Sequence, residues 1–193
     1  MPRVKLFDQQ KVLERAMELF WEKGYHATSM QDLVDNLGIN RASLYDTYGG
    51  KKDLFLQSFA YYRSIHIKTA REFLFQYKKV KDGIRALFYM AIEQPGSTDN
   101  SRGCFVVNTT TELLPGDMEI EQIIQNNRLV FEQLFYEYLQ YGIEKRQIPK
   151  KKDIKSIATL LFTLYNGIKV LSKTNPEKED MLRAVNTALT LLD

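Results

Sequence analysis

The chain contains 193 residues and carries a formal net charge of +3, with 44% hydrophobic and 26% charged residues. This composition is that of a globular protein with a buried core, and it excludes a disordered or fibrous chain. One cysteine, Cys104, allows no internal disulfide. The N-terminus lacks the apolar core of a signal peptide, and the most apolar segment, 157–171, is too short to span a bilayer. We therefore expect a cytoplasmic protein with no membrane partner.

Apolar residues recur at helical spacing along the whole chain, and no segment shows the alternation typical of a strand. Helices are predicted at 9–23 and 41–48, with a helix of about two turns between them that ends before Gly38. Further helices are predicted from residue 51 onwards and at 80–94, 103–113, 117–146, 152–173 and 177–192. The clearest loop is "PGSTDNSRG", residues 95–103. The prediction is an all-α fold of about nine helices. It comprises a helix-turn-helix DNA-binding domain at 1–52 and a helical regulatory and dimerisation domain at 53–193.

The second and third helices are short, and both have start and stop signals. Thr28 and Gln31 have the spacing of a capping box at the start of the second helix, with Ser29 as the alternative cap. Gly38 can adopt the left-handed conformation that ends this helix, and Asn40 is a good N-cap for the third. Two short helices joined by "LGIN" are the pattern of a helix-turn-helix motif.

The third helix is predicted to present its N-terminal half to solvent, where such a motif meets base edges in the major groove. The outward side chains are Arg41, Ala42, Ser43, Tyr45 and Asp46. Arg41 can form two hydrogen bonds with guanine, while small Ala42 and Ser43 allow the backbone to approach closely. Tyr45 can donate its hydroxyl to phosphate. The free N–H groups that begin the second and fourth helices also suit phosphates, with side-chain donors from Thr28, Ser29 and Lys52.

Two other interpretations of the same residues are open. The motif can be an ordinary helical hairpin with exposed polar residues, or a vestigial DNA motif in a helical adaptor that binds only protein. The charge of residues 1–52, eight Lys or Arg against seven Asp or Glu, does not decide between these interpretations and DNA binding. "GGKK" at 49–52 can be a phosphate loop of an enzyme. A P-loop, however, has Ser or Thr after its lysine and a strand before its glycines. His26 and His66 belong to no metal-binding spacing, so we expect no catalysis, no cofactor and no metal.

The stretch "LFWEKGYHATSMQDLVDNLGINRASLYDTYGGKKDLF", residues 19–55, resembles the N-terminal domain of the TetR/AcrR family of bacterial transcriptional regulators. The resemblance implies a DNA-binding motif at 29–48. It places Thr28, Arg41, Ala42, Ser43, Tyr45 and Lys52 where family members touch DNA. The sequence departs from the family pattern at Asp46 and Thr47. A phosphate would repel the Asp46 carboxylate, which can instead accept from cytosine N4 or orient Arg41.

The resemblance further implies a repressor that leaves its operator when a small-molecule inducer binds among the C-terminal helices. It also implies a homodimer formed by the last two helices, and the apolar residues on nearly every side of 152–173 favour such a dimer independently. The candidate pocket residues are Phe88, Ile92, Phe105, Asn108, Glu112, Phe131, Phe135, Tyr138 and Tyr165. Glu112 is either a buried counter-ion for a cationic ligand or an exposed carboxylate near a helix end. Cys104 is either a redox-sensing thiol or a buried, inert one.

Overall fold

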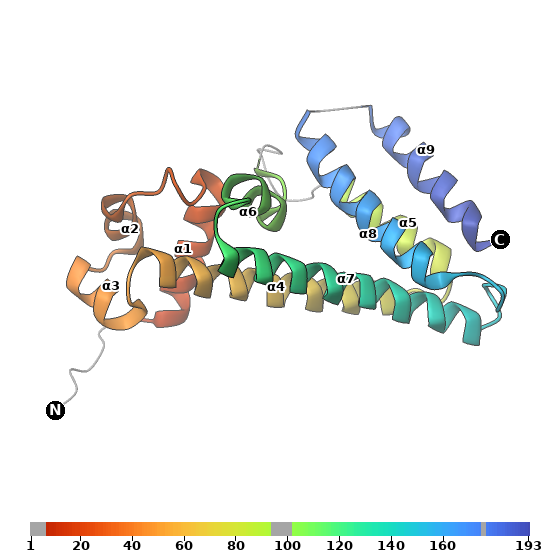
Figure 1. Cartoon of the computed structure of the whole chain (residues 1–193), viewed down its shortest axis with the longest axis horizontal. Helices are drawn as coiled ribbons and strands as arrows, with labels where there is room; N and C mark the ends of the chain where they lie inside the picture. Colours follow the sequence, from red (N-terminus) through yellow and green to blue (C-terminus); the bar gives the residue numbers. More distant parts are fainter. Residues whose placement is uncertain (1–6, 94–101, 175–176) are drawn as a thin grey trace.

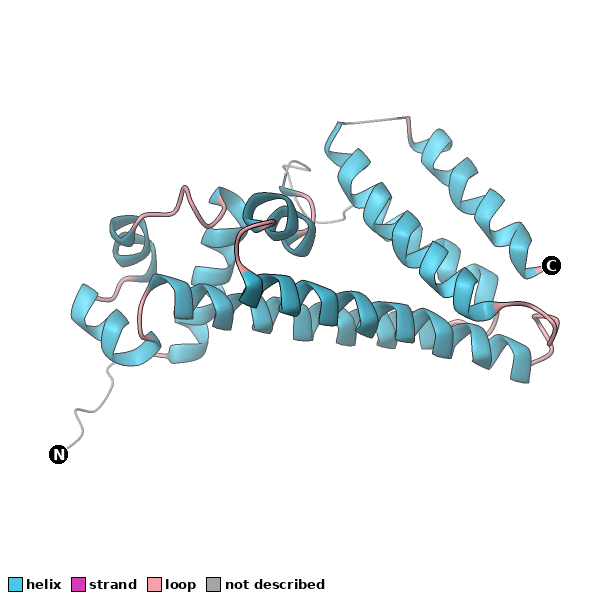
Figure 2. Ribbon diagram, viewed as in Figure 1, coloured by secondary structure: helices cyan, strands magenta, loops and turns pink. Residues whose placement is uncertain are grey.

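The computed structural model of the chain describes residues 7–93, 102–174 and 177–193, and every regular element in these ranges is a helix (Figure 2). The N-terminal helices are α1 (Gln9–Lys23), α2 (Met30–Leu37), α3 (Arg41–Tyr48) and the long α4 (Lys51–Phe75). They are followed by α5 (Val80–Glu93), α6 (Phe105–Leu113), α7 (Met118–Glu144), α8 (Ile154–Leu171) and α9 (Lys178–Leu189). The predicted all-α fold is confirmed, and most of the predicted loop 95–103 lies outside the described residues.

The helices form an elongated molecule whose long axis is set by α4 and α7, which run side by side (Figure 1). At one end, α1, α2 and α3 gather around the start of α4. At the other end, α8 packs on α7, and α5 lies against α4, α8 and α9. The short α6 contacts α4, α7 and α8 between the two ends.

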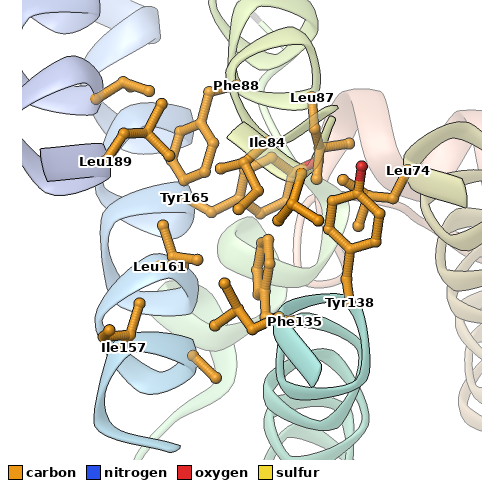
Figure 3. Packing of buried hydrophobic residues seen from close by; sticks show 14 of the residues in the cluster. Leu74, Ile84, Leu87, Phe88, Phe135, Tyr138, Ile157, Leu161, Tyr165 and Leu189 are labelled. Carbon is orange, nitrogen blue, oxygen red and sulfur yellow. The ribbon is translucent and has the colours of Figure 1, made fainter. Parts of the chain in front are cut away.

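Two hydrophobic cores occupy these two ends. The core at the α3 end is built from α1–α4 together with Phe105 of α6 and Ile120 of α7. The other core contains the second half of α4, from Ala70, with α5, α7, α8 and α9; Figure 3 shows Tyr165 of α8 among residues of α5 and α7. Because α4 contributes to both cores, and because α6 and α7 close the first one, a domain boundary at residue 52 stays a prediction.

Two environments would suit a helix as apolar as α8: a membrane or the interior of a protein. By length and composition alone, Ile154–Thr174 would suffice to cross a membrane. Ile157, Leu161 and Tyr165, however, are buried in the core shown in Figure 3. A core helix of a soluble protein meets the same criteria of length and composition.

Gly83 of α5 faces the fully buried Tyr138 of α7, and this contact leaves no room for a side chain. A Cβ at Gly83 would lie 2.1 Å from Tyr138 Oη and 2.9 Å from its Cζ. The ring is closely packed and has little space to move. We expect Gly83→Ala to lower the free energy of unfolding by about 1–3 kcal/mol, as measured by urea denaturation followed by circular dichroism.

Tyr138→Phe provides the matched background for that measurement. The Tyr138 hydroxyl is buried and has no hydrogen-bond partner among the described residues, so its removal alone should leave stability unchanged or slightly higher. In this background Gly83→Ala should cost less than in the native chain. An equal cost in both backgrounds would contradict the predicted clash.

Candidate functional site

The turn between α2 and α3 has the geometry of a helix-turn-helix motif. Gly38 adopts the left-handed conformation, with φ 67° and ψ 26°, and its N–H donates to the carbonyl of Val34. No atom lies within 4 Å of a Cβ built at Gly38, so the backbone conformation is what favours glycine here. Leu33, Ile39 and Leu44 are buried in the angle between the helices. These three side chains fix the orientation of α3, and the opposite side of the helix faces solvent.

The start of α2 differs from the predicted capping box. Ser29 is the N-cap: its hydroxyl accepts from the N–H of Asp32 at 3.0 Å, and the Asp32 carboxylate accepts from the N–H of Ser29 at 2.8 Å. Asp32, rather than Gln31, is therefore the partner. Hydrogen bonds from Lys23 and Ser29 hold the pKa of Asp32 well below its usual range. Lys23 Nζ lies 2.6 Å from a carboxylate oxygen of Asp32, and this ion pair connects the start of α2 to the end of α1.

Thr28 is a correction to the predicted DNA contacts. Its side chain is fully buried, and its hydroxyl donates to the carbonyl of Gly24 at 2.6 Å. The hydroxyl closes the turn between α1 and α2, so it has no surface from which to reach a phosphate. Ser29, the neighbouring predicted donor, is exposed.

The outer face of α3 carries the predicted polar residues. Arg41, Ala42, Tyr45 and Asp46 are exposed, and Ser43 is partly buried. The Arg41 guanidinium carbon lies 5.9 Å from the centroid of the Tyr45 ring. Asn40 caps the helix as predicted, and its side-chain oxygen accepts from the N–H of Ser43 at 2.8 Å. The structure therefore brings an arginine, two small residues, a tyrosine and a carboxylate together on one exposed helical surface.

The start of α4 is tied to other parts of the chain. The Lys51 ammonium lies 4.5 Å from the centroid of the Tyr25 ring. Lys52 Nζ lies 3.0 Å from a carboxylate oxygen of Asp117 and 3.0 Å from one of Glu119. Hydrogen bonds to these two acids raise the pKa of Lys52 to about 12. The lysine predicted to meet phosphate thus pairs with the first turn of α7.

The "GGKK" segment lacks the surroundings of a P-loop. Gly49, with φ 89°, and Gly50, with φ 153°, join two helices. In the part of the chain that the structure describes, no strand precedes them. A P-loop places its glycines between a strand and a helix, where successive N–H groups surround phosphate.

Glu112, in the last turn of α6, contacts the turn that follows α1. Its carboxylate accepts from the N–H of Tyr25 at 3.0 Å and from the N–H of His26 at 2.7 Å. A Cβ at Gly24 would lie 2.9 Å from Glu112 Oε2, so the glycine permits this approach. These two backbone bonds give the Glu112 carboxylate a structural partner in the chain, and its role as the counter-ion of a cationic ligand stays a prediction.

A cavity of about 530 Å³ lies between the two cores. Its walls come from α1, α4, α5, α8 and the segment that leads into α6. The lining residues are Glu18, Trp21, Tyr62, His66, Thr69, Ala70, Phe73, Leu87, Met90, Ala91, Arg102, Gly103, Cys104, Tyr165 and Lys169. A molecule bound here would touch both α1, beside the motif, and α8, in the other core.

The predicted pocket residues lie mostly outside this cavity. Tyr165 is the one predicted residue that lines it, and Phe131 joins Tyr165 at a small neighbouring void of about 10 Å³. Asn108 donates its side-chain amide to the carbonyl of Arg102 at 2.7 Å. The other predicted residues that pack in the two cores are Phe88, Ile92, Phe105, Phe135 and Tyr138.

A cluster of ionisable side chains lies at the cavity wall. Of its members, only Cys104 was predicted from the sequence as a candidate reactive group. Lys169 is 7% exposed, and its Nζ lies 3.7 Å from Cys104 Sγ, 3.1 Å from His66 Nε2 and 4.0 Å from the centroid of the Tyr165 ring. The Tyr62 hydroxyl lies 3.8 Å from the same sulfur. The available signal was Lys169 itself, the one charged residue in the apolar segment 157–171.

The charges in this cluster depend on one another. Burial raises the pKa of the Cys104 thiol, but the Lys169 ammonium and hydrogen bonds from Val107, Tyr62 and Val106 outweigh it and lower the pKa. Burial likewise opposes the charge of Lys169, yet the Cys104 thiolate keeps the lysine pKa above its usual value. Burial and the Lys169 charge hold the pKa of His66 well below its usual range. These directions favour the thiolate of Cys104, the ammonium of Lys169 and the neutral imidazole of His66.

No group of three or more His, Cys, Asp or Glu that suits a metal ion occurs within the described ranges. The cluster around Cys104 consists of a lysine, a histidine, a tyrosine and the cysteine itself. A lysine beside a thiol favours the thiolate form of the cysteine.

Comparison with family models matches both parts of the chain. Residues 12–57 match the model described as bacterial regulatory proteins, tetR family. Residues 81–188 match the model described as tetracyclin repressor-like, C-terminal domain. The two matches together cover both the helix-turn-helix end and the helices that surround the second core.

Individual relatives are similar over nearly the whole chain. The HTH-type transcriptional regulator YezE of Bacillus subtilis is 32% identical, with all of both chains covered. The HTH-type transcriptional repressor ComR of Escherichia coli is 28% identical over 98% of this chain and 90% of its own. A solved structure of the TetR family regulator CifR, a cysteine mutant in complex with 26-bp double-strand operator DNA, has a TM-score of 0.85. It is 27% identical and covers 99% of this chain and 100% of its own.

Glu112→Gln tests the contact between α6 and the turn after α1. The amide can accept one N–H but places its own NH2 group against the other, so one charge-assisted hydrogen bond is lost. We expect a loss of about 1 kcal/mol in the free energy of unfolding and faster hydrogen exchange at the amides of Tyr25 and His26. Glu119→Gln is the control, since Glu119 contacts Lys52 instead. Unchanged exchange at both amides would contradict the assigned contact.

Proposed function

Because the chain belongs to the tetR family of bacterial regulatory proteins, we propose that it is a repressor whose α3 binds operator DNA and whose operator affinity an effector in the cavity lowers. The observation that carries the proposal is the exposed polar surface of α3. The side chains buried between α2 and α3 fix the orientation of this surface. The proposal gives the protein no catalytic role and places it in the cytoplasm with the chromosomal DNA. Residues 1–52 would bind DNA, and 53–193 would regulate and dimerise.

Each exposed residue of α3 has a role that follows from its chemistry. Arg41 forms two hydrogen bonds with a guanine in the major groove, and Ala42 and Ser43 allow close approach. Tyr45 donates its hydroxyl to a phosphate and packs its ring on the sugar. Asp46 accepts from cytosine N4, because a phosphate would repel its carboxylate. Asn40 caps α3, and Ser29 donates to a phosphate near the start of α2.

A homodimer would present two copies of α3 to two half-sites about 34 Å apart. An apolar stripe on α8 supports such a dimer: Leu160, Val170 and Leu171 are 42%, 47% and 51% exposed. Gly167 lies on the same stripe, and a Cβ there would meet no atom within 4 Å, so a partner helix can approach closely. Leu191, just after α9, is 43% exposed and extends the apolar surface.

The effector acts by shifting the population between two arrangements of the motif. The cavity reaches α1 through Trp21 and α8 through Lys169, so its occupant contacts both the DNA-binding end and the dimer-forming end. A tenfold loss of operator affinity requires only about 1.4 kcal/mol of coupling. That is about the contribution of a single hydrogen bond.

Arg41→Ala tests the base contact. We expect operator affinity to fall by about 1–3 kcal/mol, while non-specific affinity and the salt dependence change little. Fluorescence anisotropy with DNA from beside the gene, at fixed salt, measures both affinities. Lys151→Ala is the control: it removes one exposed charge from the connection between α7 and α8, far from α3 (Figure 1). A protein-binding adaptor would respond to neither change.

Val170→Arg tests the dimer surface. A charged side chain on the apolar stripe should disrupt pairing of α8 and produce a monomer in size-exclusion chromatography with light scattering. Since one half-site contact replaces two, operator affinity should fall by about a hundredfold. Leu129→Arg alters an equally exposed apolar residue, 56% exposed on α7. A dimer that survives Val170→Arg but not Leu129→Arg would place the interface elsewhere.

A further inference from the structure

A concentration of positive charge lies at the end of the molecule opposite α3, where the connection from α7 to α8 is found (Figure 1). The connection from α4 to α5 meets it there. Gln147 accepts from the N–H of Val80 at 2.8 Å and donates to the carbonyl of Lys78 at 2.7 Å. The basic residues of the two connections and of the first turn of α8 form what we call the distal lysine surface: Lys78, Lys79, Lys145, Arg146, Lys150, Lys151, Lys152 and Lys155.

The eight side chains of this surface form no ion pair with an acid of the described chain. All are exposed except Lys152, which is partly buried. Stretches 76–80 and 144–155 hold these eight cations against two acids, Glu144 and Asp153, a net charge of +6. The whole chain carries +3, so the remaining residues carry −3.

The needs of the helix ends do not account for this charge. α4 and α7 end here, and the C-terminus of each contributes a partial charge of about −0.5. α5 and α8 begin here, and their N-termini contribute about +0.5 each, so the four ends cancel. Residues 1–52, which contain α3, are only +1. Like charges on one surface repel one another and disfavour the compact state, and an anionic partner would relieve that repulsion.

Arg146 adds a positive charge at a position that favours glycine. It follows α7 in the left-handed conformation, with φ 58°. The N–H of Gln147 donates to the carbonyl of Gly142 at 2.8 Å, and the N–H of Arg146 to that of Ile143 at 3.0 Å. These two hydrogen bonds form a Schellman motif, whose left-handed position is usually glycine. Among the described residues, Arg146 is the only one other than glycine with a positive φ.

The chemistry of the distal lysine surface suits the phosphates of DNA. Lysine binds phosphate oxygens as a point charge and reads no base sequence. A membrane-binding surface, by contrast, inserts apolar side chains into the lipid. None of the large apolar side chains that the described chain exposes lies in 76–79 or 145–153, so these connections lack such an anchor.

The length of α4 separates this surface from α3. α4 has 25 residues, which corresponds to about 38 Å at the rise of an α-helix. DNA is stiff over about 150 bp, so an operator bound at α3 cannot bend back within its own length to reach the lysines. Their partner is therefore a separate duplex or a distant segment of the same DNA.

We propose that the distal lysine surface binds the backbone of a second DNA duplex without sequence preference, so that a molecule on its operator holds two segments of DNA together. The bridging rests on the proposed function, because one of the two duplexes is the operator at α3, whereas the lysine contacts do not. Each side chain that reaches a phosphate releases condensed cations from the duplex. Binding of the second duplex is therefore steeply dependent on salt.

The test loads the full chain with a stoichiometric amount of unlabelled DNA from beside its gene, and then adds a short fluorescent duplex of unrelated sequence. Anisotropy should show that the second duplex binds at low salt. Lys78→Gln/Lys150→Gln removes one charge from each connection. It should weaken this binding at least about tenfold and reduce the slope of log affinity against log salt by about 2. Operator affinity should stay unchanged, because both residues lie far from α3.

Lys68→Gln/Arg128→Gln is the matched control. Both side chains are exposed and lie on α4 and α7, outside the distal lysine surface. The control has the same net charge as the Lys78→Gln/Lys150→Gln variant and should bind both duplexes as the native chain does. Arg146→Gly separates charge from folding: it should raise the midpoint of urea unfolding, since glycine suits the left-handed position, and still weaken binding of the second duplex.

Four results would overturn the inference. They are a loaded chain that binds no second duplex, an unchanged salt slope in Lys78→Gln/Lys150→Gln, an equal loss in the control, and unchanged binding in Arg146→Gly. Binding to phosphatidylserine vesicles but not to the duplex would make this a lipid surface and would also overturn it. If the DNA from beside the gene does not bind, the proposed function fails, while the same variants with the unrelated duplex alone still decide the lysine surface.

Discussion

The packing of Phe105 anchors α6 on the core at the α3 end of the molecule. Its ring lies 5.8 Å from that of Phe55, 5.2 Å from Phe59 and 5.4 Å from Tyr62, each in an edge-on arrangement. Trp21 of α1 stacks at 6.5 Å. Such aromatic pairs add to the area that they bury and prefer defined angles. The first residue of α6 is therefore held by α1 and α4, and both ends of this short helix are placed by that anchor.

Polar contacts at the two ends of α6 give this anchor a functional meaning. Before Phe105, Cys104 faces the buried Lys169, whose charge requires a partner. After it, Glu112 binds the backbone of the turn between α1 and α2. Lys52 adds a second contact, from the start of α4 to the first turn of α7. The helix-turn-helix motif is thus attached to the remaining helices through Glu112 and Lys52, while Cys104 and Lys169 at the other end of α6 line the cavity.

The parts of the site that were predicted from sequence are those that local rules control. Gly38, Asn40 and the buried Leu44 orient α3 through backbone conformation, capping and helical period, all of which act within a few residues. The exposed Arg41 and Tyr45 follow from the same period. Thr28 was misplaced because its role depends on one hydrogen bond to Gly24, and capping spacing alone does not separate it from Ser29.

Apart from Tyr165, the residues that line the cavity were not predicted, because residues far apart in the chain come together there. Most of the predicted pocket residues are aromatic or aliphatic, and helical period marks such residues as buried without showing whether they face a core or a void. His66 and Lys169 come together across 103 residues, and nothing in either local segment records the other.

By itself, the sequence determined the helices, the helix-turn-helix motif and its outward face, because propensity, capping and amphipathic period are local properties. Only the tertiary structure decided that Glu112 serves the motif, that Lys52 pairs with α7 and that Cys104 has a counter-charge. Those outcomes depend on the distance and burial of groups brought together by packing, and electrostatic interactions vary steeply with both.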